Sequence, residues 1–179
     1  KFSRVFNLLS KNKAAARAHE RFVKEYLGEE IFFYHATDST AIELREKPLK
    51  KETLMPKEKK KRGRPKKGEK REPKESILQK QQKMESTKEM LSLISTATDV
   101  GIKQNAKGHR YQWIGGKLHL GVVDGDIPIS AIYSSASVHD SSVALPLMNE
   151  SSAKVTYLYD LNDSAYHAEI IENFSQSKG

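Results

Sequence analysis

Two aspartates, Asp38 and Asp163, each close a run of residues that has the composition of a buried strand. The first run, residues 31–37, is aromatic and β-branched, and the second, residues 155–162, alternates Val, Thr, Tyr and Leu. Strands hold side chains in fixed positions, and carboxylate oxygens are the ligands that Mg²⁺ prefers, with Mn²⁺ as a second candidate. The two aspartates therefore predict a divalent-metal site where two strand segments end.

Each aspartate also has an ordinary structural interpretation. Asp38 is followed by Ser and Thr, and this combination is typical of a turn. Asp163 precedes a predicted helix over residues 165–175, and Asp is a favoured helix N-cap. Asp99 is a competing first acid, although it follows a predicted helix and precedes a loop rich in Gly, Asn and Lys. The presence of two aspartates at two strands favours Asp38 with Asp163, and the structural alternatives stay open.

A polybasic segment between the two strands predicts a contact with DNA. Its residues are Lys61, Arg62, Gly63, Arg64, Pro65, Lys66 and Lys67. The Arg-Gly-Arg-Pro core with flanking lysines resembles the AT-hook motif. Gly63 permits a close backbone approach, and the two arginines can lie in the narrow minor groove of A·T-rich DNA. The alternative is a solvated charged linker.

The excess positive charge of the chain lies in and around this polybasic segment. The 179 residues include 37% hydrophobic and 30% charged residues, and the net charge of +8 favours an anionic partner such as nucleic acid. Residues 45–74 hold 15 Lys or Arg and 5 Glu, together with four of the six prolines. Such a segment cannot bury enough apolar surface to fold, so we predict that it is disordered.

Other classes of protein and site are less compatible with this sequence. The absence of Cys excludes disulfides and Cys-based zinc sites. No apolar run approaches the ~18 residues that suggest a membrane span, so we expect no membrane partner. The chain begins at Lys1 rather than Met, so we expect that residues preceding it, including any signal peptide, can be missing.

Hydrophobic periodicity predicts a mixed α/β fold. A helix is expected over residues 2–27, with a break near residues 10–12, and a strand over 31–44. A helix over 75–94 and a loop over 96–109 follow. Asp124 and Gly125 predict a hairpin between strands over 111–123 and 127–135. The last predicted elements are a helix over 138–150 that Pro146 kinks or breaks, a strand over 155–159 and a helix over 165–175. This order predicts a mixed sheet with flanking helices.

Four segments, in this order, carry a resemblance to a known family. They are Asp38-Ser39-Thr40-Ala41-Ile42-Glu43, Trp113-Ile114-Gly115-Gly116-Lys117-Leu118-His119-Leu120, Ser137-Val138-His139-Asp140-Ser141 and Asp163-Ser164-Ala165-Tyr166. Together they resemble the DDE transposases of bacterial insertion sequences over about residues 29–179.

The resemblance implies a ribonuclease-H-like α/β fold, interrupted by the long basic insertion. Residues 1–28 would be the helical end of an N-terminal region, and residues 29–44 the first strand of the catalytic domain. Residues 45–106 would form the basic, proline-rich insertion and a helix, and residues 107–179 the remainder of an incomplete catalytic domain. In this family the first Asp lies on the first strand and the second just after the fourth, which are the predicted positions of Asp38 and Asp163.

The resemblance also implies an activity. Asp38 and Asp163 would hold two Mg²⁺ ions with a third acid, usually Glu, which we expect beyond Gly179. The ions would support DNA strand cleavage and transfer. Lys117, His119 and Asp140 match family motifs without being assigned to catalysis. The expected partner is DNA, bound by a homo-oligomer, in the bacterial cytoplasm and associated with the nucleoid. The alternative is a non-catalytic, A·T-preferring DNA-binding remnant that acts through the AT-hook-like segment.

Overall fold

The structure is a computed structural model that describes residues 2–48, 75–104 and 107–178. The AT-hook-like segment and most of the predicted disordered region lie outside the described residues. The helices and strands follow the chain as α1 (Phe2–Lys11), α2 (Ala14–Tyr26), β1 (Ile31–Glu43), α3 (Ile77–Gln81), α4 (Thr87–Ser92), β2 (Asp99–Gln104), β3 (Arg110–Val123), β4 (Ile127–Ser135), α5 (Ser141–Ser152), β5 (Thr156–Asn162), the 3₁₀ helix η1 (Ser164–Tyr166) and α6 (Glu169–Gln176).

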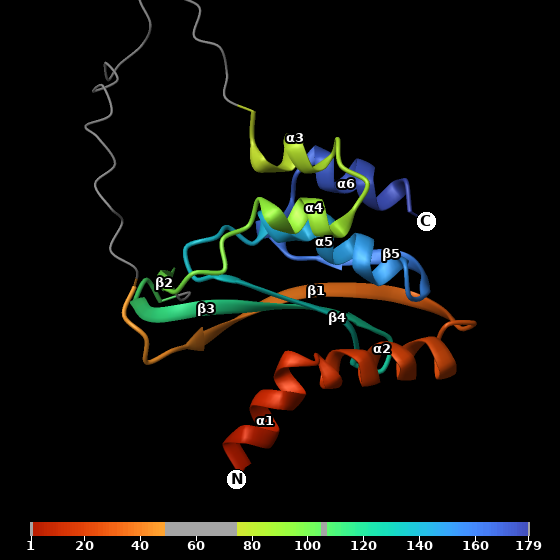
Figure 1. Ribbon diagram of the computed structural model, residues 1–179. Coiled ribbons are helices and arrows are strands. Elements are labelled where there is room, and N and C mark those ends of the chain that lie inside the picture. The colour runs from red at the N-terminus through yellow and green to blue at the C-terminus, as the bar shows by residue number, and fades with distance from the viewer. Residues whose placement is uncertain (1, 49–74, 105–106, 179) are drawn as a thin grey trace, which may run out of the picture.

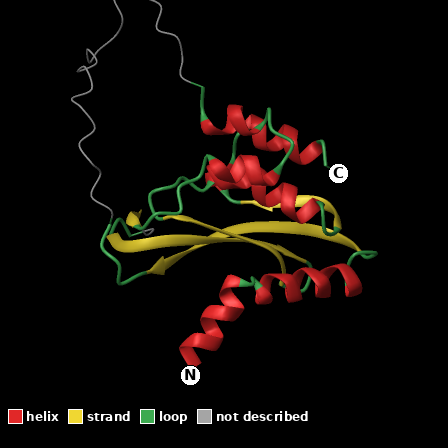
Figure 2. Cartoon of the chain, in the orientation of Figure 1, coloured by secondary structure: helices red, strands yellow, loops and turns green. Residues whose placement is uncertain are grey.

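Five strands form one mixed sheet, whereas the sequence predicts a mixed sheet of four strands without β2 (Figures 1 and 2). β1 pairs with β5 in parallel and with β3 in antiparallel orientation. The other edge of β3 pairs with β4 along residues 116–123 and with β2 along residues 110–115. β5 follows α5 and lies beside β1, so the first and last strands of the chain are direct neighbours.

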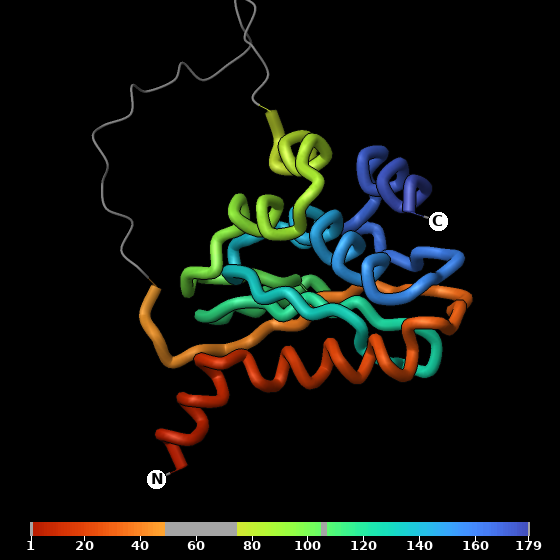
Figure 3. Tube along the Cα trace, turned by 45° about the vertical axis from the view of Figure 1, so that its right-hand side comes forward, coloured from red at the N-terminus to blue at the C-terminus, as the bar shows by residue number. Residues whose placement is uncertain are grey.

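Helices cover both faces of the sheet (Figures 1 and 3). α2 packs on one face, where Val23 joins a buried cluster with Phe32, Val123 and Ile129. α5 packs on the other face, and α3, α4 and α6 lie over α5. Burial of these apolar side chains on two sides gives the sheet its stability, at about 25 cal/mol per Å² removed from water.

Three predicted elements differ from the structure. The predicted loop over residues 96–109 contains β2, because Gly101 lets the ring of Trp113 lie directly against that strand. A Cβ at Gly101 would come within 2.4 Å of this ring. The predicted helix over residues 75–94 is two short helices: α3 begins at the capping residue Ser76 and ends at Gln81, and α4 begins after Ser86. Similarly, residues 165–175 divide into η1 and α6.

Pro146 lies inside α5 without breaking it. A proline has no N–H to donate to the carbonyl four residues earlier, which here belongs to Ser142. The buried side chain of Gln81 donates its Nε2 to that carbonyl at 2.9 Å. Gln81 therefore satisfies the acceptor that Pro146 leaves free, and it joins α3 to α5.

Candidate functional site

Asp38 lies within β1, five residues before the end of that strand. It pairs with Leu120 of β3, and its Oδ1 accepts a hydrogen bond from the backbone N–H of Ser39 at 2.7 Å. The alternative of a turn at Asp38 is therefore wrong, and so is the expectation that the strand ends there. The predicted continuation of the strand past Asp38 is confirmed.

Asp163 directly follows β5, as predicted. Its Oδ1 accepts the backbone N–H of Ala165 at 2.9 Å, so the predicted capping role is confirmed, here for η1. The expectation that β5 is buried is wrong. β5 is an edge strand, and Tyr159 and Leu161 are 66% and 52% exposed.

The parallel pairing of β1 with β5 makes Asp38 and Asp163 neighbours. The last paired residues are Thr37 and Asn162, and each aspartate is the next residue along its strand direction. Neighbouring strands lie about 4.8 Å apart. The two candidate acids, 125 positions apart in the sequence, therefore reach the same point of the sheet.

Asp99 does not share this position. It begins β2 and pairs with Gly115, whose partner on β1 is Glu43 rather than Asp38. Of the two candidates for a first acid, only Asp38 neighbours Asp163.

Tyr166 is buried, and its pKa is influenced by several carboxylates. Burial raises the pKa of Tyr166, and the negative charges of Asp140, Asp163 and Asp38 raise it further. Its hydroxyl has no hydrogen-bond partner among the described residues. Tyr166 therefore remains protonated at neutral pH.

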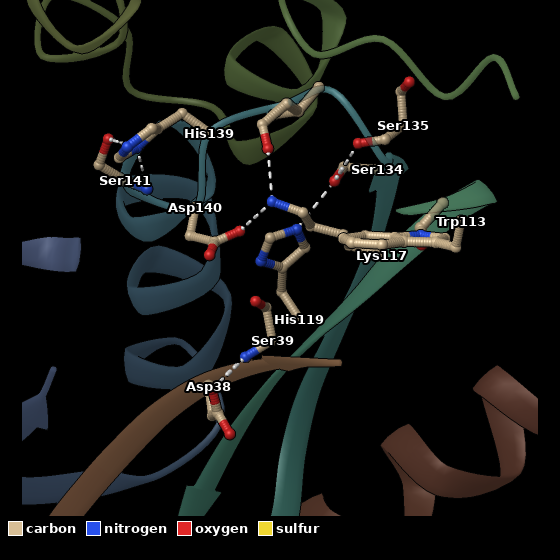
Figure 4. Close-up of polar contacts among 12 residues, drawn as sticks. Asp38, Ser39, Trp113, Lys117, His119, Ser134, Ser135, His139, Asp140 and Ser141 are labelled. Carbon is tan, nitrogen blue, oxygen red and sulfur yellow. Dashed lines mark hydrogen bonds and ion pairs between the residues drawn. The ribbon is translucent and has the colours of Figure 1, made fainter. Parts of the chain in front are cut away.

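A second polar cluster lies on the α5 side of the sheet (Figure 4). Lys117 donates from Nζ to Asp140 Oδ1 at 2.8 Å and to the carbonyl of Val138 at 2.9 Å. His119 Nε2 lies 2.8 Å from Ser134 Oγ. The side chain of Asp38 points away from this cluster, whereas its neighbour Ser39 pairs with His119 and lies on the same side (Figure 4).

Burial lowers the pKa of His119 to about 4 from an ordinary value of 6.5. Above pH 6.5 the imidazole is neutral in both the folded and the unfolded chain. Between pH 6.5 and about 4, the unfolded chain binds a proton that the folded chain does not, so unfolding becomes easier as the pH falls. We expect His119 to account for a loss of about 3 kcal/mol over that interval.

The measurement is urea unfolding of the native chain and of His119→Gln at pH 7.5 and at pH 4.5. We expect the variant to lose clearly less stability on acidification than the native chain. Equal losses in the two proteins would show that His119 is readily protonated in the folded state.

Sequence reasoning missed His35 and Asp160, which join β1 to β5. His35 is fully buried, and its Nδ1 lies 2.7 Å from Asp160 Oδ1. Ser175 of α6 donates to the other oxygen of Asp160, and the His35 ring stacks on Tyr157. Each partner lies three residues before a candidate acid, so this contact holds the register that makes Asp38 and Asp163 neighbours. No local signal reveals a contact between residues this far apart in sequence.

The described residues contain no group of three or more His, Cys, Asp or Glu side chains that could hold a metal ion. Asp38 and Asp163 thus form a pair rather than a full ligand set in the part of the chain that the structure describes. No helix in the described part of the chain has the length and apolar character needed to span a bilayer.

Comparisons with known proteins identify no relative. No protein-family model matches the chain, and neither a curated protein nor a solved structure matches it.

Proposed function

We propose that this chain is the catalytic region of a DDE-type DNA transposase with a ribonuclease-H-like fold. The observation that carries the proposal is the adjacency of Asp38 and Asp163 on the parallel strands β1 and β5. The strand arrangement is compatible with it, because β1, β3 and β4 are antiparallel neighbours and β5 returns through α5 to lie parallel to β1.

The two aspartates fit a hard divalent cation. In each carboxylate, Oδ1 accepts a backbone N–H, which fixes the orientation of the group. Oδ2 accepts no hydrogen bond from a described residue, so it is free to bind Mg²⁺ or Mn²⁺. The resemblance to DDE transposases leads us to expect a Glu as the third acid.

A bound divalent ion would supply activation of water or of a DNA 3′-hydroxyl, and stabilisation of the leaving oxygen. The residues of this chain hold the geometry. His35 and Asp160 keep β1 and β5 in register, while the backbone amides of Ser39 and Ala165 orient the two carboxylates. Such positioning is the main contribution of a protein to phosphoryl-transfer chemistry.

The basic composition of residues 45–74 favours a second candidate function, an A·T-preferring DNA-binding remnant without catalysis. The AT-hook-like residues 61–67 would carry that binding alone. The two proposed functions differ in whether Asp38 on β1 and Asp163 after β5 bind a divalent ion.

The test is cleavage of the chain by iron bound in place of Mg²⁺. The full chain is incubated with Fe²⁺, ascorbate and hydrogen peroxide, and the fragments are identified by mass spectrometry. We expect cuts near Asp38 and near Asp163, which disappear in excess Mg²⁺. This readout requires neither a complete ligand set nor enzymatic turnover.

Cuts at other positions, or cuts that Mg²⁺ does not suppress, would contradict the metal site. If the chain binds DNA but iron produces no cuts near Asp38 and Asp163, the result would support the non-catalytic alternative.

A further inference from the structure

A small pocket opens on the α5 side of the sheet, one residue away from Asp38. Its volume is about 120 Å³. The residues that line it come from β1, β2, β3 and the start of α5, and they are Ser39, Ala41, Ile102, Lys103, Trp113, Lys117 and Asp140. Figure 4 shows Lys117, Trp113 and Ser39 in this region, with Asp38 on the far side of β1.

The charge of the pocket suits an anion. Lys117 uses two of its three N–H donors on Asp140 and on the carbonyl of Val138, which leaves one donor for a ligand. Lys103 is exposed on β2, and Ser39 supplies a hydroxyl. Two ammonium groups face one carboxylate, so the pocket carries a net positive charge.

Trp113 forms one wall of the pocket, and its own contacts fix its position. The Trp113 ring is 6% exposed, and its Nε1–H donates to the carbonyl of Gly116 at 3.1 Å. The ring lies against Gly101, where no side chain fits. Trp113 therefore forms a fixed apolar wall, and the two hydrogen bonds of Lys117 orient its ammonium group in the absence of ligand.

We propose that this pocket binds a backbone phosphate of the DNA on which the proposed transposase acts. The inference rests on the proposed function, because it names a contact to the substrate of that site. Ser39 lines the pocket and directly follows Asp38 on β1, so the pocket and the Asp38 side chain lie on opposite sides of the strand.

The chain contains a matched control for Lys117. Lys154 donates to the carbonyl of Ile129 at 3.0 Å and to Glu150 at 2.8 Å, and its side chain is 18% exposed against 16% for Lys117. The two lysines have the same kind of partners and similar burial. They differ in position, because Lys154 does not line the pocket beside Asp38.

The experiment measures the affinity of the full chain for a short fluorescent DNA duplex at several salt concentrations. All proteins carry Arg62→Ala and Arg64→Ala, so that the AT-hook-like segment contributes less. We expect Lys117→Met to weaken binding at least about threefold at low salt. We also expect it to reduce the slope of log affinity against log salt by about 0.9, the value for one phosphate contact. Lys103→Ala should act in the same direction, and Lys154→Met should change neither quantity.

The double variant Lys117→Met with Asp140→Asn separates contact from structure. It removes the unpaired carboxylate that the single variant leaves behind, so thermal stability should recover while DNA affinity should not. Recovery of DNA affinity in the double variant would overturn the proposal. Equal losses of DNA affinity in Lys117→Met and Lys154→Met would also overturn it, and so would the absence of any DNA binding.

Failure of the proposed function is recognised separately. If the iron cuts near Asp38 are absent but Lys117→Met still removes one phosphate contact, the pocket binds DNA and the metal chemistry is rejected. If the iron cuts are present and Lys117→Met behaves like Lys154→Met, the metal site stands and the phosphate pocket is rejected.

Discussion

Replacing either Asp38 or Asp163 with Asn removes the iron-dependent cuts at both positions. Loss of both cuts is expected because the two aspartates follow the last paired residues of β1 and β5 and would share the bound ion. An amide is a neutral and weaker ligand for a hard cation than a carboxylate. We expect the metal affinity to fall at least about 100-fold, since even residues that only support a ligand contribute 10–100-fold.

The Asn substitutions are chosen because they keep the local structure. An Asn Oδ1 at either position can still accept the backbone N–H that the aspartate accepts now. Unfolding free energies within about 0.5 kcal/mol of the native value would show that the fold is retained. Asp126→Asn, in the β3–β4 turn with a φ of 58°, is the control and should keep both cuts. Separate loss of only the nearer cut in each variant would contradict a shared ion.

Replacing His35 with Leu destabilises the chain by about 3–5 kcal/mol, as expected when a buried polar pair loses one partner. Asp160 is 5% exposed at its side chain, and the variant leaves its carboxylate with Ser175 as its remaining side-chain partner among the described residues. The stacking of His35 on Tyr157 is lost as well. Urea unfolding at pH 7 measures the effect.

A second substitution tests whether the carboxylate is the cause. His35→Leu combined with Asp160→Leu removes both polar partners, and we expect it to recover a large part of the lost stability. Lys83→Ala, which breaks the exposed ion pair with Glu75, is the control and should change stability by less than about 1 kcal/mol. A double variant less stable than His35→Leu would contradict the assignment.

Both predictions depend on the register of β1 against β5, that is, on which residues of the two strands lie opposite each other. A slip of one residue between β1 and β5 would turn Asp38 and Asp163 to different positions and would separate His35 from Asp160. A destabilised His35 variant that retains some fold should therefore also bind Fe²⁺ less tightly.

The sequence alone was enough to select several elements and residues. The periodicity of the apolar residues predicted the mixed sheet, the turn residues Asp124 and Gly125 predicted the hairpin, and the polar residues 10–12 predicted the break between α1 and α2. The types of residue around Asp38 and Asp163 selected them as candidate acids. These are local signals, because strand, turn and capping preferences depend on residues that lie close together in the chain.

Only the tertiary structure decided which of these residues meet. The proximity of Asp38 to Asp163, the exclusion of Asp99, and the contact of His35 with Asp160 all depend on the parallel pairing of β1 with β5. β2 was missed because its place depends on Gly101 fitting against Trp113. Contacts between distant segments follow from packing of the whole chain, which no short stretch of sequence encodes.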